Sequence, residues 1–116
     1  MAKETTPFAV RSKIWIEDME GNVVFGLGRY RILEMICQWG SMHAAAKELH
    51  MSYRAVWMRI RMSEERIGKQ LVVREGRGSR LTPFAEKLMK QFKRLHTLVE
   101  VESDVVYENL MSDHLT

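Results

Sequence analysis

The apolar positions change period along the chain and divide it into short β-favouring runs and longer helical stretches. Residues 14–16 and 23–25 are apolar runs of the first kind, and Gly21-Asn22 between them has turn chemistry. They predict a small β-hairpin. Gly26 and Gly28 then interrupt the strand pattern, and apolar residues between 32 and 37 recur at helical spacing until Gly40. This second stretch predicts a helix.

Two further helices follow, each preceded by a serine that can cap its first turn. Ser41 is the N-cap candidate for a short helix over 42–50, and Ser52 for a longer helix that ends at Gly68. The apolar face of the first comprises Met42, Ala45, Ala46 and Leu49, and the buried seam of the second comprises Val56, Ile60, Ser63 and Ile67.

Only residues 50–52 separate these two helices, so the helices must cross at a steep angle, which is the geometry of a helix-turn-helix. The β-favouring runs 71–74 and 79–81 come next and flank Glu75-Gly76-Arg77-Gly78, which predicts a second hairpin. A helix-turn-helix followed directly by a basic hairpin is a winged helix. The predicted fold class is mainly α with two small β-hairpins.

Thr82-Pro83 supplies an N-cap and a proline at the first helical position, and so predicts a last, long helix. Its apolar stripe, interrupted at Glu102, comprises Phe84, Leu88, Phe92, Leu95, Val99, Val106 and Leu110. An unbroken helix of about 27 residues would be about 40 Å long, which exceeds the diameter of a small domain. Its apolar stripe therefore needs a partner, and the sequence predicts a homodimer through this helix.

Charge is unevenly distributed along the 116 residues, although the net charge is only +3. Residues 54–94 carry twelve Lys and Arg against four Glu, whereas residues 95–116 carry five acids and no Lys or Arg. Clustered cations gain affinity for polyanions by releasing counterions from phosphates. The central segment therefore predicts a double-stranded DNA partner, with a solvated charged face as the alternative.

The predicted DNA-binding residues lie at helix starts, on the exposed side of the helix after Ser52, and on the second hairpin, because these parts meet the grooves and phosphates of DNA. They are Ser41, Ser52, Tyr53, Arg54, Trp57, Met58, Arg61, Arg74, Arg77 and Arg80. Four alternatives stay open: the ring of Trp57 capping the core beside the shorter helix, Met58 as an ordinary exposed helix residue, solvated arginines in the hairpin, and serines that act only as N-caps.

Other functions find little support in the residues. Cys37 is the one cysteine, and its place on the apolar face of the first helix predicts a buried, inert thiol. His43 and His50 lie seven residues apart, but no further ligands complete a metal shell. No phosphate loop or catalytic motif is recognised, so neither a cofactor nor an enzyme is predicted. No apolar run reaches the length of a membrane span, and a cytoplasmic location is expected.

The run 40–52, Gly-Ser-Met-His-Ala-Ala-Ala-Lys-Glu-Leu-His-Met-Ser, resembles the helix-turn-helix of LysR-type and ModE-type regulators. Residues 51–57, the hairpin start 71–74 with Leu81-Thr82, and the upstream runs 14–18, 23–26 and 28–29 are similar to ModE-type domains in particular. The resemblance covers about residues 13–95. It implies a dimer that binds palindromic operators and controls genes of molybdate uptake or molybdenum enzymes.

The chain departs from the ModE pattern in a shorter hairpin tip, 75–79, and in ending at residue 116, before any oxyanion-binding domain. A stand-alone regulator is therefore expected, with a separate effector-sensing protein as a possible partner. The predicted organisation is an arm at 1–12, a winged helix-turn-helix domain at 13–82, a dimerisation helix at 83–111 and a tail at 112–116. Two alternative functions remain: a sequence-tolerant nucleoid protein and a protein-interaction module.

Overall fold

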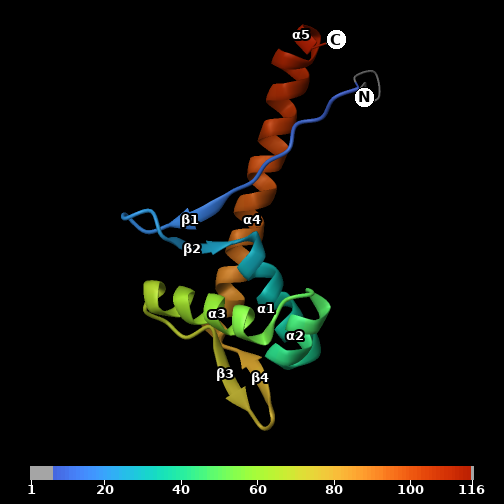
Figure 1. The fold of residues 1–116 in the computed structure, drawn as a ribbon. Coiled ribbons are helices and arrows are strands. Elements are labelled where there is room, and N and C mark those ends of the chain that lie inside the picture. Colours follow the sequence, from blue (N-terminus) through green and yellow to red (C-terminus); the bar gives the residue numbers. More distant parts are fainter. Residues whose placement is uncertain (1–6, 116) are drawn as a thin grey trace. The chain divides into compact units, whose positions relative to one another are not determined.

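In a computed structural model, residues 7–115 are described, and they form two compact units (Figure 1). One unit comprises residues 15–91, and the other comprises the segment that ends at Ile14 together with the chain from Phe92 onward. The elements are, in order, β1 (Trp15–Glu17), β2 (Val23–Gly26), α1 (Leu27–Trp39), α2 (Met42–Glu48), α3 (Tyr53–Ile67), β3 (Val72–Glu75), β4 (Gly78–Leu81), α4 (Pro83–Val106), the π-helical turn η2 (Tyr107–Met111) and α5 (Ser112–Leu115).

Both predicted hairpins are present as two-stranded antiparallel sheets. In the first, Ile16 of β1 lies opposite Phe25 of β2. Its turn is held by Asp18, whose carboxylate accepts hydrogen bonds from the backbone N–H of Asn22 and of Glu20 and from the Asn22 side chain. These bonds favour the charged form and lower the pKa of Asp18, the bonds from Asn22 most of all. In the second, Val72 pairs with Leu81 and Glu75 with Gly78.

The helix starts follow the predicted caps. The Ser41 and Ser52 hydroxyls accept hydrogen bonds at 3.0 Å from the backbone N–H of Ala44 and Ala55. Thr82 Oγ1 accepts one at 3.1 Å from the N–H of Ala85 and so caps α4. Helix α2 ends at Glu48, two residues before the predicted end, and His50 has the left-handed φ of 56° in the turn that follows.

Two expectations about α1 are wrong. The helix begins at Leu27, so Gly28 lies inside its first turn instead of in the strand break before it. Cys37, expected on the buried face, is exposed. The buried residues of α1 are Ile32, Leu33 and Ile36, and Cys37 lies 100° further round the helix from Ile36, where the core does not extend.

The core of the 15–91 unit is assembled where α1, α2 and α3 meet. Its fully buried members include Phe25, Leu33, Ala45, Val56, Ile60, Leu71 and Ala85. Ser63 of the predicted seam is also fully buried, and its hydroxyl donates a 2.6 Å hydrogen bond to the carbonyl of Val24. Ile67, the last member of that seam, is only half-buried, whereas Glu64 is buried at 8% exposure.

Helix α4 runs for 24 residues, and the π-helical turn η2 then interrupts the regular α-helix at Tyr107. Within the second unit, residues 7–11 and the helical residues Asp104, Tyr107 and Glu108 line a cavity of about 300 Å³. The Ser12 hydroxyl donates a 3.3 Å hydrogen bond to that of Ser103. The N-terminal segment therefore covers one side of the helix, and Tyr107 retains only 7% exposure.

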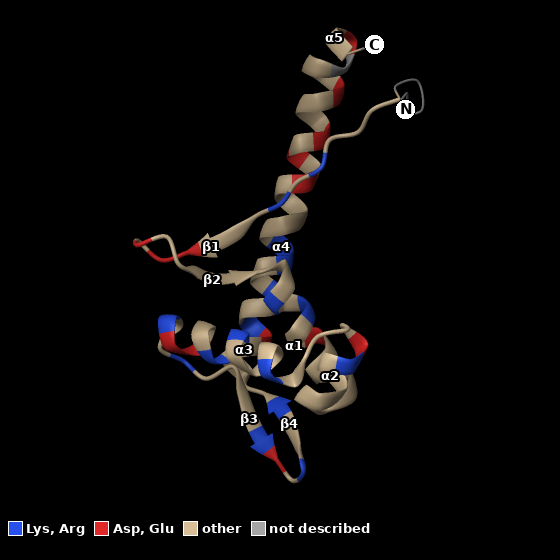
Figure 2. Ribbon diagram, viewed as in Figure 1, with Lys and Arg blue, Asp and Glu red and all other residues tan. Residues whose placement is uncertain are grey.

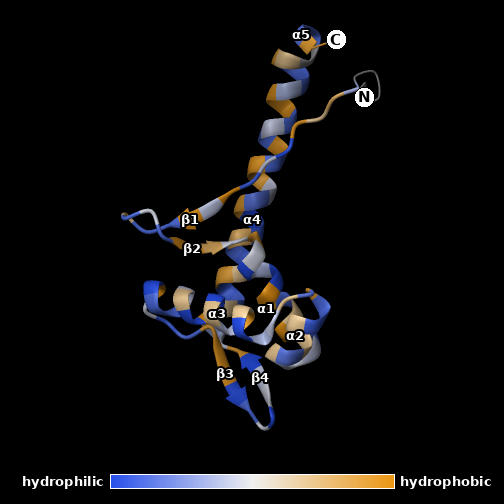
Figure 3. Ribbon diagram, viewed as in Figure 1, coloured by the Kyte–Doolittle hydropathy of each residue, from blue (hydrophilic) through white to orange (hydrophobic). Residues whose placement is uncertain are grey.

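The other side of this helix leaves large apolar side chains exposed. They are Leu95, Leu98, Val101, Val105, Val106 and Leu110. Figure 3 shows hydrophobic positions recurring along α4 to its end. Of the stripe predicted for dimerisation, Phe92 is buried within the chain, Phe84, Leu88 and Val99 are half-buried, and Leu95, Val106 and Leu110 are exposed. Across residues 7–115, no helix is both long enough and apolar enough to cross a membrane.

Candidate nucleic-acid interface

The N-terminal half of α3 presents large side chains to solvent. Tyr53, Trp57 and Met58 are each between 41% and 42% exposed, and Arg54 is exposed beside them. More than half of the Trp57 side chain is nevertheless covered, so the alternative in which its ring caps the core beside α2 stays open. A wide aromatic and cationic surface at the start of a helix is the arrangement with which recognition helices enter a major groove.

A cleft of about 440 Å³ lies between the start of α2, the helix α3 and the β3–β4 hairpin. Six of the ten predicted DNA-binding residues line it: Ser41, Tyr53, Trp57, Arg61, Arg74 and Arg77. The other four, Ser52, Arg54, Met58 and Arg80, lie outside its lining; Ser52, Arg54 and Met58 are at the start and on the outer face of α3, and Arg80 is on β4. The fold thus brings residues from four segments of the chain around one basic groove.

His43 belongs to this cleft, although the sequence pointed to it only as a possible metal ligand. Its ring stacks on that of Tyr53 with centroids 4.1 Å apart and an interplanar angle of 12°. The stack joins the first turn of α2 to the first turn of α3 and holds Tyr53 in the cleft wall. His50 lies beyond the end of α2, and among residues 7–115 no three His, Cys, Asp or Glu side chains gather as a metal site.

Arg61 is held on two sides. Its guanidinium carbon lies 5.4 Å from the centroid of the Trp57 ring, and its Nη1 donates to Glu64 Oε1 at 3.0 Å. The side chain is still 54% exposed, and it lines the cleft. A stacked and paired guanidinium has a fixed orientation, which lowers the entropy cost of placing it against a phosphate or a base.

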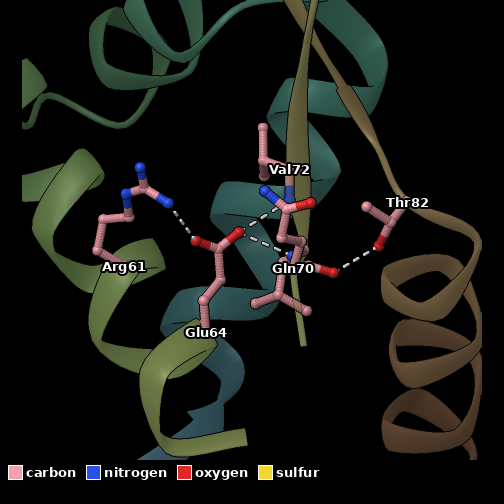
Figure 4. Close-up of polar contacts among 6 residues, drawn as sticks. Arg61, Glu64, Gln70, Val72 and Thr82 are labelled. Atoms are coloured by element: carbon pink, nitrogen blue, oxygen red, sulfur yellow. Dashed lines mark hydrogen bonds and ion pairs between the residues drawn. The ribbon is translucent and has the colours of Figure 1, made fainter. Parts of the chain in front are cut away.

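Glu64 links α3 to the β3–β4 hairpin, and sequence reasoning missed it (Figure 4). Its Oε2 accepts hydrogen bonds from the backbone N–H of Leu71 at 2.8 Å and of Val72 at 3.2 Å. Its other oxygen accepts from Arg61. The sequence did contain a signal for this role. Glu64 follows Ile60 by four residues and so lies next to the buried seam of α3, where a carboxylate needs hydrogen-bond partners.

The β3–β4 hairpin presents Arg74 and Arg77 to solvent around a tip where Gly76 has the left-handed φ of 58°. Arg80 is exposed as well, but its Nε is paired with Glu75 Oε1. The hairpin rests on the turn between α1 and α2, because the N–H of Ser79 donates to the Gly40 carbonyl at 2.8 Å. A Cβ at Gly78 would lie 2.2 Å from that same carbonyl oxygen.

Lys and Arg concentrate on α3, on the hairpin and on the first half of α4, whereas acidic residues dominate the last part of α4 (Figure 2). Of the four acids in residues 54–94, Glu64 and Glu75 are paired with Arg61 and Arg80. Each pair cancels one cation together with one acid, so the positive charge that remains at the cleft and the hairpin comes from the exposed Arg74 and Arg77, and it suits a phosphate backbone.

A steep helix pair, a basic second helix and a basic hairpin packed beside it define a winged helix-turn-helix protein. The profile of the bacterial regulatory helix-turn-helix proteins of the lysR family matches residues 27–86. The chain belongs to this family. The match begins at the first residue of α1 and ends in the first turn of α4, so it covers all the elements that line the cleft.

Three similar proteins agree with this assignment. An uncharacterised HTH-type transcriptional regulator of Mycobacterium tuberculosis is 41% identical over 58 residues, which are 50% of this chain and 19% of that protein. The molybdenum transport protein ModE of Azotobacter vinelandii is 31% identical over 87 residues, 71% of this chain and 32% of that protein. The DNA-binding domain of CbnR, solved in a DNA complex, has a TM-score of 0.58 at 25% identity over 70% of this chain and 93% of that one.

The chain thus spans about a fifth to a third of the length of these curated relatives. The relationship to the lysR family is established over the helix-turn-helix and the wing. The closer resemblance to ModE-type domains stays a prediction, because it rests on one partial relative beside the residues quoted from the sequence.

Proposed function

We propose that this protein is a transcription regulator that binds double-stranded DNA with α3 and the β3–β4 wing. The observation that carries the proposal is the cleft between these two elements, lined by Arg61, Arg74 and Arg77 and flanked by the exposed start of α3. Membership of the lysR family and a fold similar to that of CbnR, which was solved on DNA, support it.

Each part of the surface has a role in this proposal. Arg54 and Met58, on the outer face of α3, enter the major groove and contact base edges. DNA phosphates accept hydrogen bonds from the hydroxyls of Ser41, Ser52 and Tyr53. Arg61, in the cleft, contributes a positive charge to the same phosphate contacts. The wing arginines Arg74, Arg77 and Arg80 contact the backbone or an adjacent minor groove.

We further propose a homodimer that binds palindromic operators. In this arrangement 13–82 is the DNA-binding domain and 83–111 the dimerisation helix, whose exposed apolar side meets the same side of a second copy. Two recognition helices related by a two-fold axis then read half-sites about one helical turn, or roughly 34 Å, apart.

The ModE-like character is proposed on the β1–β2 hairpin before α1 and on the similarity to the Azotobacter protein. It would place the targets among genes of molybdenum metabolism, with effector sensing left to another domain or a separate protein. Genome-wide footprinting tests this point, because the promoters that are bound name the pathway.

The direct test is a mobility-shift series at several salt concentrations with wild type, Arg54→Ala and Arg77→Ala. If Arg54 reads a base, its loss weakens specific binding by about 1–3 kcal/mol and relaxes specificity at one position. Loss of Arg77 weakens binding to all sequences alike and lowers the salt slope by about one. Arg31→Ala, an exposed arginine of α1, is the control.

Competition with bulk genomic DNA separates this proposal from a sequence-tolerant nucleoid protein. A regulator retains its sites against the competitor by a factor of about a thousand or more. Absent or salt-independent binding of any duplex by the purified wild type rejects the proposal.

A further inference from the structure

A second group of cations lies outside the cleft, on the opposite flank of α3. Arg59 and Arg66 are seven residues apart on this helix and share a side, and Arg29 approaches them from the first turn of α1. Arg59 precedes the cleft residue Arg61 by two positions, which corresponds to about 200° around an α-helix. None of the three arginines lines the cleft.

The three guanidinium groups are oriented by neutral partners. Arg66 Nη1 donates a 2.6 Å hydrogen bond to the carbonyl of Val23 in β2. Arg29 Nε donates to the carbonyl of Arg59 at 3.4 Å, and Arg59 Nη1 to that of Ala55 at 3.5 Å. Backbone carbonyls fix the direction of these side chains without cancelling their charge, and most of the guanidinium N–H donors remain available.

No carboxylate in the described part of the chain forms an ion pair with any of these three arginines. Burial lowers the pKa of Arg29, and the positive charges of Arg59 and Arg66 lower it further. Asp18 feels the charge of Arg66, but its carboxylate is occupied by the hydrogen bonds within its own turn. The cluster therefore carries a concentrated positive charge that the protein does not neutralise.

We propose that the cluster of Arg29, Arg59 and Arg66 binds a phosphate group. Guanidinium groups form forked, charge-assisted hydrogen bonds with phosphate oxygens, and the positive charges of the neighbouring arginines add to the attraction. The phosphate can belong to a DNA strand beside the recognition helix or be free in solution. This site is separate from the DNA-binding cleft and goes beyond the function proposed above.

The first experiment titrates the full chain with inorganic phosphate at constant ionic strength and follows the arginine Nε–H signals by NMR. The signals of Arg29, Arg59 and Arg66 shift together, and Arg59→Gln or Arg29→Gln weakens binding about tenfold or more. Arg59→Lys, which keeps the charge, retains much of the affinity. The matched control, Arg31→Gln on α1, leaves the affinity within about twofold.

The second experiment identifies the source of the phosphate. If it belongs to DNA, the variant Arg29→Gln/Arg59→Gln lowers the salt slope of duplex binding by about one to two, because each lost contact changes the slope by roughly 0.9. An unchanged slope together with phosphate binding identifies a free anion. Far-UV circular dichroism melts confirm that each variant is folded, and Arg66→Gln is left out because Arg66 also holds β2.

The inference is overturned if folded wild type shows neither the phosphate-induced shifts at these arginines nor a change of slope in the variants. Wild type that binds phosphate here but no duplex refutes the regulator proposal and leaves this site standing. A different outcome refutes the arginine cluster and leaves the regulator proposal standing. In that case Arg54→Ala loses duplex binding, the cluster variants keep the salt slope of wild type, and phosphate shifts none of the three arginine signals.

Discussion

At the scale of single residues, a substitution of Glu64 tests whether this side chain holds the recognition helix α3 and the wing together. Glu64→Gln removes the charge and replaces one carboxylate oxygen by an NH2 donor, so the side chain can no longer accept from Arg61 and from the N–H groups of Leu71 and Val72 together. We expect a loss of about 1–3 kcal/mol in the free energy of unfolding, because buried donors are left poorly paired. Urea denaturation measures it.

The neighbouring exposed residue supplies the control. Glu65→Gln removes the same charge one position along α3 and is expected to stay within about 0.5 kcal/mol of wild type. Equal stability of the two variants contradicts the structural role given to Glu64. With both variants folded, we expect Glu64→Gln alone to alter DNA affinity, because it also releases Arg61 in the cleft.

At the scale of elements, the wing can pack against the α1–α2 turn only because Gly78 has no side chain. A Cβ at Gly78 would lie 2.2 Å from the Gly40 carbonyl oxygen, which is backbone and cannot simply rotate away. Gly78→Ala is therefore expected to destabilise the fold by about 1–3 kcal/mol or to displace the wing. Thermal denaturation and the affinity for DNA report the two outcomes.

Gly28→Ala is the matched control for that substitution. A Cβ at Gly28 meets nothing within 4 Å, and the residue lies in the first turn of α1. Alanine there is expected to raise stability by up to about 1 kcal/mol, because glycine loses more backbone entropy in a helix. A Gly78→Ala protein as stable and as active as Gly28→Ala contradicts the close packing of the wing.

At the scale of the whole molecule, the homodimer that we propose depends on the exposed apolar side of α4. Leu98 is 60% exposed and lies on the same side as Leu95 and Val105. Leu98→Glu places a charge in the proposed interface and is expected to shift the protein to monomers in sedimentation velocity. Specific operator binding then falls sharply, because the two half-sites are no longer bound together.

Glu100→Lys, at an exposed position about 200° round the helix from Leu98, changes the charge on the side away from Leu98 and is expected to leave the dimer intact. A wild-type protein that sediments as a monomer at micromolar concentration contradicts the homodimer and favours a role for this helix in binding a different protein.

Most of the helices and strands could be predicted from the amino-acid sequence, because the signals that define them are local. The serine and threonine caps at Ser41, Ser52 and Thr82, the glycines after α1 and α3, and the apolar period between them act within one helical turn. For the same reason six predicted residues from four segments were found around one cleft: once the elements and their order are known, a winged helix-turn-helix leaves few alternatives.

The remaining features were decided by contacts between segments distant in sequence. Sequence reasoning assigned no role to Glu64, because its partners, the N–H groups of Leu71 and Val72, lie beyond the end of its own helix. Cys37 is exposed because the elements that pack against α1 do not extend over its position. The His43–Tyr53 stack and the arginine cluster likewise join separate helices. A periodic pattern indicates which side of a helix is buried, but only tertiary packing determines which group lies opposite it.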